Sequence, residues 1–165
     1  MHRPALVAIG VLALSLVSGC SSRSGGSGAY REGQTTPSGE PAYITIQHCL
    51  IGFQGSVPGK AAFRTEAEAE QLAQELFAKA QAGENFTKIV ATHTDDSPPG
   101  IYRIANDGFP GDMTSRVPSK QVQSRSQMVR AFGDTGFALQ VGEVGLASYD
   151  SETSPFGWHI IKRLK

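Results

Sequence analysis

Residues 42–51 read AYITIQHCLI and form the first predicted strand of the chain. Successive side chains of a strand point to opposite faces of its sheet, so Ile44, Ile46, His48 and Leu50 share one face. The residues that alternate with them share the other face. Because β-branched residues occur on both faces, the pattern predicts a central strand that is covered on both sides. A histidine is therefore expected inside the sheet.

Two helices are predicted after this strand. Residues 65–68 read TEAE, in which the threonine hydroxyl and the last glutamate can satisfy the exposed amides of a helix start. Apolar residues then recur every three or four positions to about Ala82, and Gly83 ends the helix. Residues 85–92 form a second, shorter helix.

The second half of the chain alternates loops with short elements. A strand is predicted at residues 101–105, and residues 106–124 are a polar loop with several glycines and prolines. Helical segments are predicted at residues 127–132 and 137–139, and closing strands at residues 144–149 and 158–164. This order predicts an α+β domain, with a small four-stranded mixed or antiparallel sheet surrounded by about four helices.

Residues 1–19 predict an export signal. A weakly basic start precedes an apolar run at residues 4–17, which is too short for a comfortable membrane span. Residues 17–20 read VSGC and resemble the bacterial lipobox, in which cleavage leaves the cysteine as a lipidated N-terminus. The alternative is an ordinary signal peptide with a chance cysteine. We expect an extracytoplasmic protein that is anchored to a bacterial membrane through Cys20.

Residues 20–41 predict a tether between this anchor and a folded domain at residues 42–165. Residues 21–40 hold almost no apolar side chains, so they are expected to be disordered and flexible. Ser21 favours the periplasmic side of the outer membrane if the organism is Gram-negative. The domain is long enough to bury a core without a disulfide or a metal.

Charge and cysteine content exclude several classes of protein. Lys and Arg number 15, as do Asp and Glu, so the chain lacks the basic excess of a nucleic-acid binder. With Cys20 lipidated, Cys49 has no intramolecular partner, and no disulfide framework is expected. Cys49 points away from His48 on a regular strand and is interpreted as a small buried hydrophobe.

Five stretches follow one another in an order that resembles the parvulin-type peptidyl-prolyl cis/trans isomerases. They are ITIQHCLI, AGENFTKIV, THTDDSPPG, SQMVRAFGDTGFALQVGEVG and SPFGWHIIKRLK, and they cover nearly all of residues 42–165. The resemblance implies a parvulin (FKBP-like) fold and a prolyl isomerase that assists the folding of exported polypeptides. Such an enzyme need only bind the twisted amide better than the planar one, so no cofactor or metal is expected.

The resemblance also implies which residues form the site. His48 and His159 are expected to face each other across a hydrogen bond and to position and polarise the site. Ser154 matches a hydroxyl that holds this pair, and Thr153 could replace it if the register shifts. Asp96 falls where the family places a cysteine or an aspartate near the substrate carbonyl. The alternative for Asp96 is a turn-forming residue, a role that its neighbour Asp95 suits equally.

An apolar pocket for the proline ring is implied at Met128 and Phe132. A third pocket position, usually leucine in the family, falls near Tyr102, which is a departure. The alternative is that Met128 and Phe132 are core residues four positions apart. If they form a pocket, Phe132→Ala should weaken substrate binding more than it destabilises the domain.

Two further features concern specificity. Phosphate-directed parvulins carry a basic cluster after the first strand, where this chain has only Lys60 and Arg64, so a phosphate clamp is not expected. The loop at residues 106–124 is either a solvated surface or a lip that selects acidic or extended clients. Its region is locally basic through Arg103, Arg116, Lys120, Arg125 and Arg130.

Two other functions compete with the enzyme. The chain could be a catalytically weak parvulin-like module that binds unfolded exported polypeptides as a chaperone, and in either case a monomer is expected. A metal site is a third hypothesis, with His48, His93, His159 and Asp96 as its ligands. His93 alone is interpreted as structural or exposed.

Overall fold

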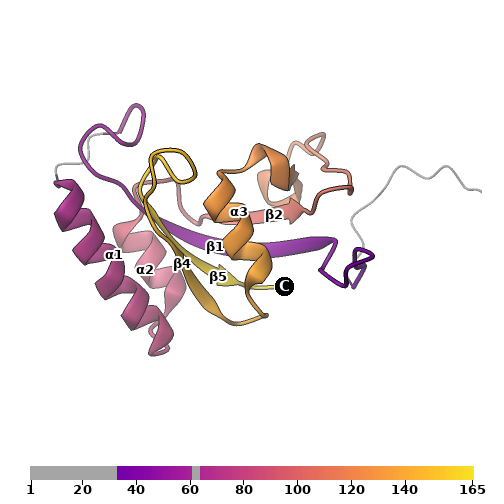
Figure 1. Cartoon of the computed structure of the whole chain (residues 1–165), viewed down its shortest axis with the longest axis horizontal. Helices are drawn as coiled ribbons and strands as arrows, with labels where there is room; N and C mark the ends of the chain where they lie inside the picture. Colours follow the sequence, from indigo (N-terminus) through magenta and orange to yellow (C-terminus); the bar gives the residue numbers. More distant parts are fainter. Residues whose placement is uncertain (1–32, 61–63) are drawn as a thin grey trace, which may run out of the picture.

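A computed structural model describes residues 33–60 and 64–165 (Figure 1). The predicted signal and Cys20 therefore lie outside the described residues. The elements in chain order are β1 (Tyr43–Ile51), α1 (Glu66–Gln81), α2 (Phe86–His93), β2 (Ile101–Ala105), β3 (Val122–Ser124), α3 (Arg130–Ala138), β4 (Val144–Ala147) and β5 (Trp158–Arg163), with short 3-10 turns at Pro118–Lys120 and Arg125–Gln127. In the described part of the chain, no helix is long and apolar enough to cross a membrane.

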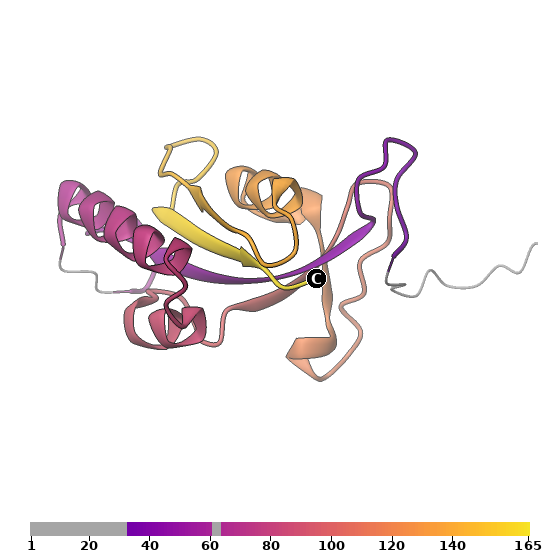
Figure 2. The same cartoon turned by 90° about the horizontal axis from the view of Figure 1, so that it is seen from below.

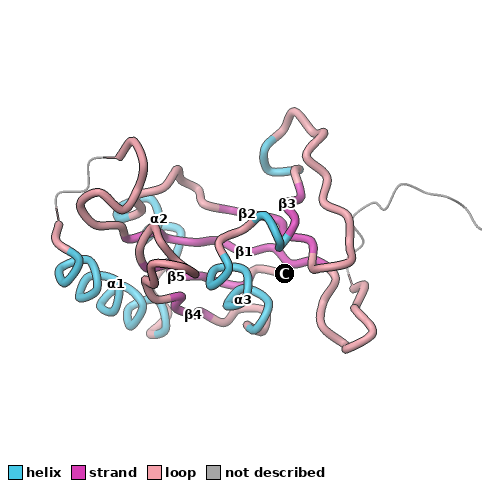
Figure 3. Tube along the Cα trace, turned by 45° about the horizontal axis from the view of Figure 1, so that its top comes forward, coloured by secondary structure: helices cyan, strands magenta, loops and turns pink. Residues whose placement is uncertain are grey.

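The sheet has five strands in the order β3-β2-β1-β5-β4. β1 lies at its centre, as the sequence predicts, and it pairs antiparallel with β2 and β5. The fifth strand was not predicted: β3, inside the polar loop, pairs parallel with β2. A strand of three residues is too short to show an alternating pattern. Figure 3 shows the remainder of this loop extending beyond β2 and β3.

The helices differ in number from the prediction. α1 begins with the predicted capping box, in which Glu68 donates its amide to the Thr65 hydroxyl and Thr65 donates its amide to the Glu68 carboxylate. The two helical segments predicted near Phe132 are one helix, α3, so the described residues hold three α-helices and two 3-10 turns. Gly133 and Gly136 lie inside α3 and weaken the sequence signal for a continuous helix.

The buried hydrophobic residues of the described chain form three clusters, and the two larger ones lie on opposite faces of β1. Cys49 and Ile51 pack with α1 and α2, while Ile44 and Ile46 pack with Phe132 of α3. Figure 2 shows α1 and α2 at one end of the sheet and α3 nearer the other. Cys49 is fully buried as predicted, and this burial raises the pKa of its thiol to about 12.

Residues 33–40, predicted to be disordered, form an ordered turn instead. Thr35 bridges Pro41, and the amide of Ala42 donates to the carbonyl of Gln34 over 2.7 Å. Ala42 and Tyr43 are buried beside Ala105. The polar segment is ordered because its backbone pairs with the chain entering β1, which composition alone does not reveal.

Candidate active site

His48 and His159 are brought together by the register of β1 and β5. His48 lies opposite Ile161, and His159 lies opposite Leu50, so the two histidines are diagonal neighbours on one face of the sheet. Diagonal neighbours are within reach of each other when their side chains are aromatic. Their Nδ1 atoms are 3.4 Å apart, and both side chains are buried.

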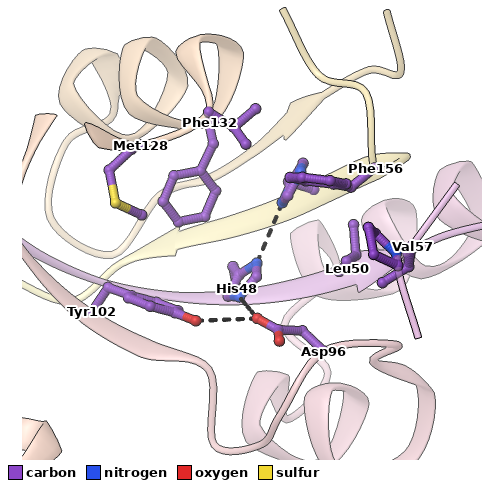
Figure 4. Close-up of a pocket in the computed structure, with 11 residues that line it drawn as sticks. His48, Leu50, Val57, Asp96, Tyr102, Met128, Phe132 and Phe156 are labelled. Atoms are coloured by element: carbon purple, nitrogen blue, oxygen red, sulfur yellow. Dashed lines mark hydrogen bonds and ion pairs between the residues drawn. The ribbon is translucent and has the colours of Figure 1, made fainter. Parts of the chain in front are cut away.

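Asp96 joins this pair from the segment after α2. Its Oδ2 atom lies 3.1 Å from Nε2 of His48 and 3.1 Å from the hydroxyl of Tyr102 (Figure 4). The hydrogen bond from His48 holds the pKa of Asp96 well below its usual range. Burial, reinforced by the negative charge of Asp96, raises the pKa of Tyr102 to about 12. At neutral pH the carboxylate therefore accepts a hydrogen bond from a protonated phenol.

These hydrogen bonds connect the two histidines to the carboxylate. Because an ionised Asp96 can only accept, Nε2 of His48 donates a hydrogen bond to it. The Nδ1 atoms of His48 and His159 lie within hydrogen-bond distance of each other, and the tautomers of the two rings decide which of them donates. Burial lowers the pKa of His159 to about 3, so its ring is neutral. Its Nε2 atom is buried without a hydrogen-bond partner among the described residues.

A pocket of about 270 Å³ opens over this hydrogen-bonded chain. Its volume is just below the range of about 300–1,000 Å³ for pockets that hold drug-sized ligands, so it suits a short stretch of polypeptide. Met128, Phe132 and Tyr102 stand on one side of His48 (Figure 4). The ring of Phe132 meets the rings of both His48 and His159 edge-on, with centroids 5.1 and 5.3 Å apart.

A family model described as the PPIC-type PPIase domain matches residues 33–165. The chain belongs to this family. It is therefore one of the parvulin-type peptidyl-prolyl isomerases, as the sequence motifs indicate. The match begins in the ordered turn before β1 and runs to the last residue.

A solved structure supports the same fold. Peptidyl-prolyl isomerase ESS1 from Candida albicans is 20% identical, with a TM-score of 0.53 over 80% of this chain. The match covers 66% of the ESS1 chain, just under two thirds of its length. The solution structure of TbPIN1 is 21% identical, with a TM-score of 0.49, over 75% of this chain and 98% of that one. At 20% identity the likeness to ESS1 establishes the fold alone. No curated protein matches the chain.

Phe132 combines the two roles that the sequence left as alternatives. Its side chain lines the pocket of the parvulin, yet it is only 2% exposed and packs in the core with Ile44 and Ile46. Met128 is only partly buried and lies at the edge of the same core. A substitution of Met128 should therefore test the pocket with a smaller loss of stability than a substitution of Phe132.

Ser154 does not hold the histidines as the family pattern implies. Its hydroxyl is buried and donates to the carbonyl of Gly157 over 2.9 Å. The hydroxyl of Thr153 donates instead to Asp150 over 2.9 Å. Both hydroxyls therefore stabilise the turn that leads into β5. The bond from Ser154 to Gly157 lies in the turn that leads to His159.

The two adjacent aspartates have separate partners. Asp95 accepts from the amide of Gly52 over 2.8 Å and pairs with Arg64, whose guanidinium also donates to the carbonyl of Gly52. Asp95 thus fastens the loop after β1, while Asp96 faces the pocket. His93 is partly exposed at the end of α2 and is not grouped with the other predicted metal ligands. Within residues 33–60 and 64–165, no three His, Cys, Asp or Glu side chains are placed to hold a metal ion.

Several lining residues were missed by the sequence analysis. They are Leu50, Val57, Pro58, Val129 and Phe156. Leu50 could have been found, because it shares the face of His48 on β1. Val57, Pro58 and Phe156 lie in loops, where no periodicity indicates which side chains face inward.

The basic loop does not form a lip over this pocket. None of residues 106–124 is among the described residues that line it. Arg125, at the end of the loop, donates to Asn106 and Asp134 and lies over the ring of Phe137. This arginine fastens the loop to α3.

Proposed function

We propose that this parvulin catalyses the cis/trans isomerisation of X-Pro bonds in exported polypeptides. The proline ring would enter the pocket end formed by Met128, Phe132 and Tyr102, with the reacting amide over His48 and Asp96. One observation carries the proposal: a single pocket combines an apolar end with a buried, hydrogen-bonded chain that ends in a carboxylate. Such a site suits a substrate that is apolar on one side and a peptide group on the other.

The reaction makes and breaks no covalent bond. The barrier to amide rotation is about 18–20 kcal/mol because resonance gives the C–N bond double-bond character. Resonance places negative charge on the carbonyl oxygen, and twisting the bond removes it. A fixed carboxylate beside the amide therefore disfavours the planar form relative to the twisted form. Binding that is stronger in the transition state accelerates the reaction.

Each residue of the hydrogen-bonded chain has a role in this proposal. Asp96 supplies the negative charge, and its side chain is 33% exposed at the pocket. His48 and Tyr102 hold its Oδ2 atom from two directions, while His159 orients His48. Ser154 shapes the turn before His159. The two histidines would position the site without transferring a proton to the substrate, because the burial that lowers the pKa of His159 keeps its ring neutral.

An isomerase assay on the full chain tests the proposal. The assay would follow peptides that contain one X-Pro bond, with Met128→Ala as the pocket variant and Val141→Ala as its control. Val141 is 66% exposed in the turn between α3 and β4. We expect Met128→Ala to reduce kcat/KM about tenfold or more, as removing apolar contacts from a substrate pocket does. Val141→Ala should match the unmodified chain.

The same assay tests the alternative, a chaperone module that binds unfolded chains without catalysis. The open pocket with apolar walls is the observation that favours this second function. An absence of rate acceleration combined with retained binding of an unfolded polypeptide would establish it and contradict the enzyme.

The site of action is a separate part of the proposal. Residues 17–20, VSGC, support lipidation at Cys20 and attachment to a bacterial membrane, on the periplasmic side of the outer membrane in a Gram-negative cell. In a bacterial host that processes lipoproteins, the full chain should sediment with membranes. Cys20→Ser should release it or leave it unprocessed, and an unchanged membrane fraction would contradict the anchor.

A further inference from the structure

Gln47 is a buried polar residue that the proposed reaction does not use. It precedes His48 on β1, so its side chain lies on the opposite face of the sheet, and it is not among the residues that line the pocket. It is 3% exposed. We propose that Gln47 is a positioning residue, which holds the segment that carries Asp96 in place for isomerisation. This inference rests on the proposed isomerase function and extends it to a residue outside the pocket.

The carboxylate of the pocket is carried by residues 94–100, the segment between α2 and β2, which we call the aspartate segment. This segment lies along the central strand. The amide of Asp95 donates to the carbonyl of Leu50 over 2.8 Å. Near the other end, the carbonyl of Gly100 accepts the amide of His48 over 2.9 Å. These backbone bonds fix the two ends of the segment to β1, and the residues between them depend on side-chain contacts.

The part of the segment that follows Asp96 contains Pro98 and Pro99, which restricts how it can be held. A proline has no N–H group, so the backbone of two successive prolines offers only carbonyl oxygens. Nε2 of Gln47 donates to the carbonyl of Pro99 over 2.9 Å. A side-chain amide supplies this donor without bringing a charge into the core. Gln47 therefore makes the one kind of backbone hydrogen bond that this stretch allows.

The oxygen of the Gln47 amide fixes the orientation of the group. Oε1 accepts from the hydroxyl of Thr87 on α2 over 3.2 Å, so the donor nitrogen is turned toward Pro99. Burying a polar group without a partner costs free energy, and here both ends of the amide have a partner. One side chain of β1 thus connects α2 to the aspartate segment.

Gln47 and His48 hold the aspartate segment from the two faces of β1. On the pocket face, Nε2 of His48 lies 3.1 Å from Oδ2 of Asp96. On the other face, Gln47 holds the backbone three residues further along, at Pro99. Because the carboxylate acts on the amide through its position, a shift of this backbone lowers the rate without removing any group from the pocket. A displacement of about 1 Å can cost about 100-fold in rate.

Gln47→Met on the full chain tests this inference. Methionine is unbranched and flexible, so it fills similar space while removing both hydrogen bonds. In the isomerase assay with X-Pro peptides, we expect kcat to fall about tenfold. KM should stay within about twofold, because Gln47 does not line the pocket. If the methionine variant does not fold, Gln47→Asn is the second variant, since its amide is one methylene shorter and cannot span the same distance.

Two matched variants locate the effect. Thr45→Val changes another buried residue on the same face of β1, whose hydroxyl has no hydrogen-bond partner among the described residues, so kcat should be unchanged. Thr87→Val removes one partner of Gln47 but keeps the bond to Pro99, so it should retain most of the activity. A loss as large as that of Gln47→Met would overturn the bond to Pro99 as the cause. Unfolding curves check that each variant is folded.

An NMR titration of the Asp96 carboxyl group reports its position independently of catalysis. The hydrogen bond from His48 holds the pKa of Asp96 below its usual range, and a displaced carboxylate loses part of that bond. The pKa of Asp96 should therefore rise in Gln47→Met and stay unchanged in Thr45→Val.

The outcomes separate this inference from the proposed function. If Gln47→Met keeps the kcat of the unmodified chain, the positioning role is overturned and the isomerase stands, whatever the change in stability. A rise in KM at constant kcat would assign Gln47 to substrate binding and would also overturn it. If the unmodified chain accelerates no peptide, the isomerase function fails. In that case the carboxyl titration still decides whether Gln47 positions Asp96.

Discussion

Gly100 packs directly against His48. A Cβ on Gly100 would stand 2.5 Å from the backbone oxygen of His48 and 3.2 Å from Cδ2 of its ring, and the φ angle of Gly100 is +63°. The carbonyl of Gly100 also accepts the amide of His48 over 2.9 Å. The glycine before β2 thus holds the segment after α2, which carries Asp96, close to the central strand.

Gly100→Ala should therefore impair both stability and activity. A non-glycine residue at positive φ costs on the order of 1–3 kcal/mol, and the new methyl group must also displace His48. Gly142→Ala is the matched control, because Gly142 has a φ of +92° and nothing within 4 Å of its Cβ position. Denaturant unfolding should show a larger loss for Gly100→Ala, and isomerase activity should fall for that variant alone. Equal losses would show that the contact with His48 is unimportant.

The Tyr102 hydroxyl should stabilise the Asp96 carboxylate. Tyr102→Phe removes one of the hydrogen bonds to Oδ2 but keeps the ring in the pocket. Unfolding measurements should show a loss of about 1 kcal/mol, the usual net value of such a bond. The same substitution in an Asp96→Asn background should cost less, because the charged acceptor is already gone. Equal costs in both backgrounds would contradict a coupling between these residues.

Stability should fall as the solution is acidified. Burial lowers the pKa of His159 from 6.5 to about 3, so between these values the unfolded chain binds a proton that the folded chain does not. The stability that His159 contributes is complete above about pH 6.5 and is lost as the pH falls toward 3. In this range the free energy of unfolding changes by up to about 1.4 kcal/mol per pH unit. Asp96, whose pKa is also lowered in the folded state, adds a loss below about pH 4.

His159→Gln tests the assignment of this slope. Unfolding free energies of both proteins would be measured from pH 4 to pH 7.5. The variant is expected to be less stable at neutral pH, but its stability should depend less steeply on pH. If both proteins lose stability at the same rate on acidification, His159 is not the residue responsible.

Phe132 and Met128 should respond differently to truncation. Phe132→Ala is expected to cost about 3–5 kcal/mol, the range for a buried phenylalanine, because its ring belongs to the core. This replaces the sequence-based expectation that substrate binding would suffer more than stability. Met128→Ala should reduce kcat/KM with a smaller loss of stability. A large destabilisation by Met128→Ala, measured in the same unfolding experiment, would make both residues structural.

The helices and strands predicted from the sequence agree with the structure to different degrees. β1 and α1 are long and strongly patterned, and both lie close to where the sequence places them. β3 escapes prediction because three residues show no periodicity, and its pairing with β2 exists only in the folded chain. α3 is divided by the prediction because Gly136 is a poor helix former. In the structure a Cβ there would stand 3.2 Å from Ile44, so the missing side chain serves close packing.

The sequence by itself determined the family, the central strand and the identity of the two histidines, because these depend on local pattern and on the order of motifs. Only the tertiary structure decided what each polar group bonds to. The register of β1 and β5 places His159 diagonal to His48. The turn after α2 brings Asp96 within hydrogen-bond distance of His48 and Tyr102. The same register sets Leu50 beside His159, where two loops add Val57 and Phe156. Contacts between segments distant in the chain leave no periodic trace in sequence, so this part of the pocket became visible only in the folded protein.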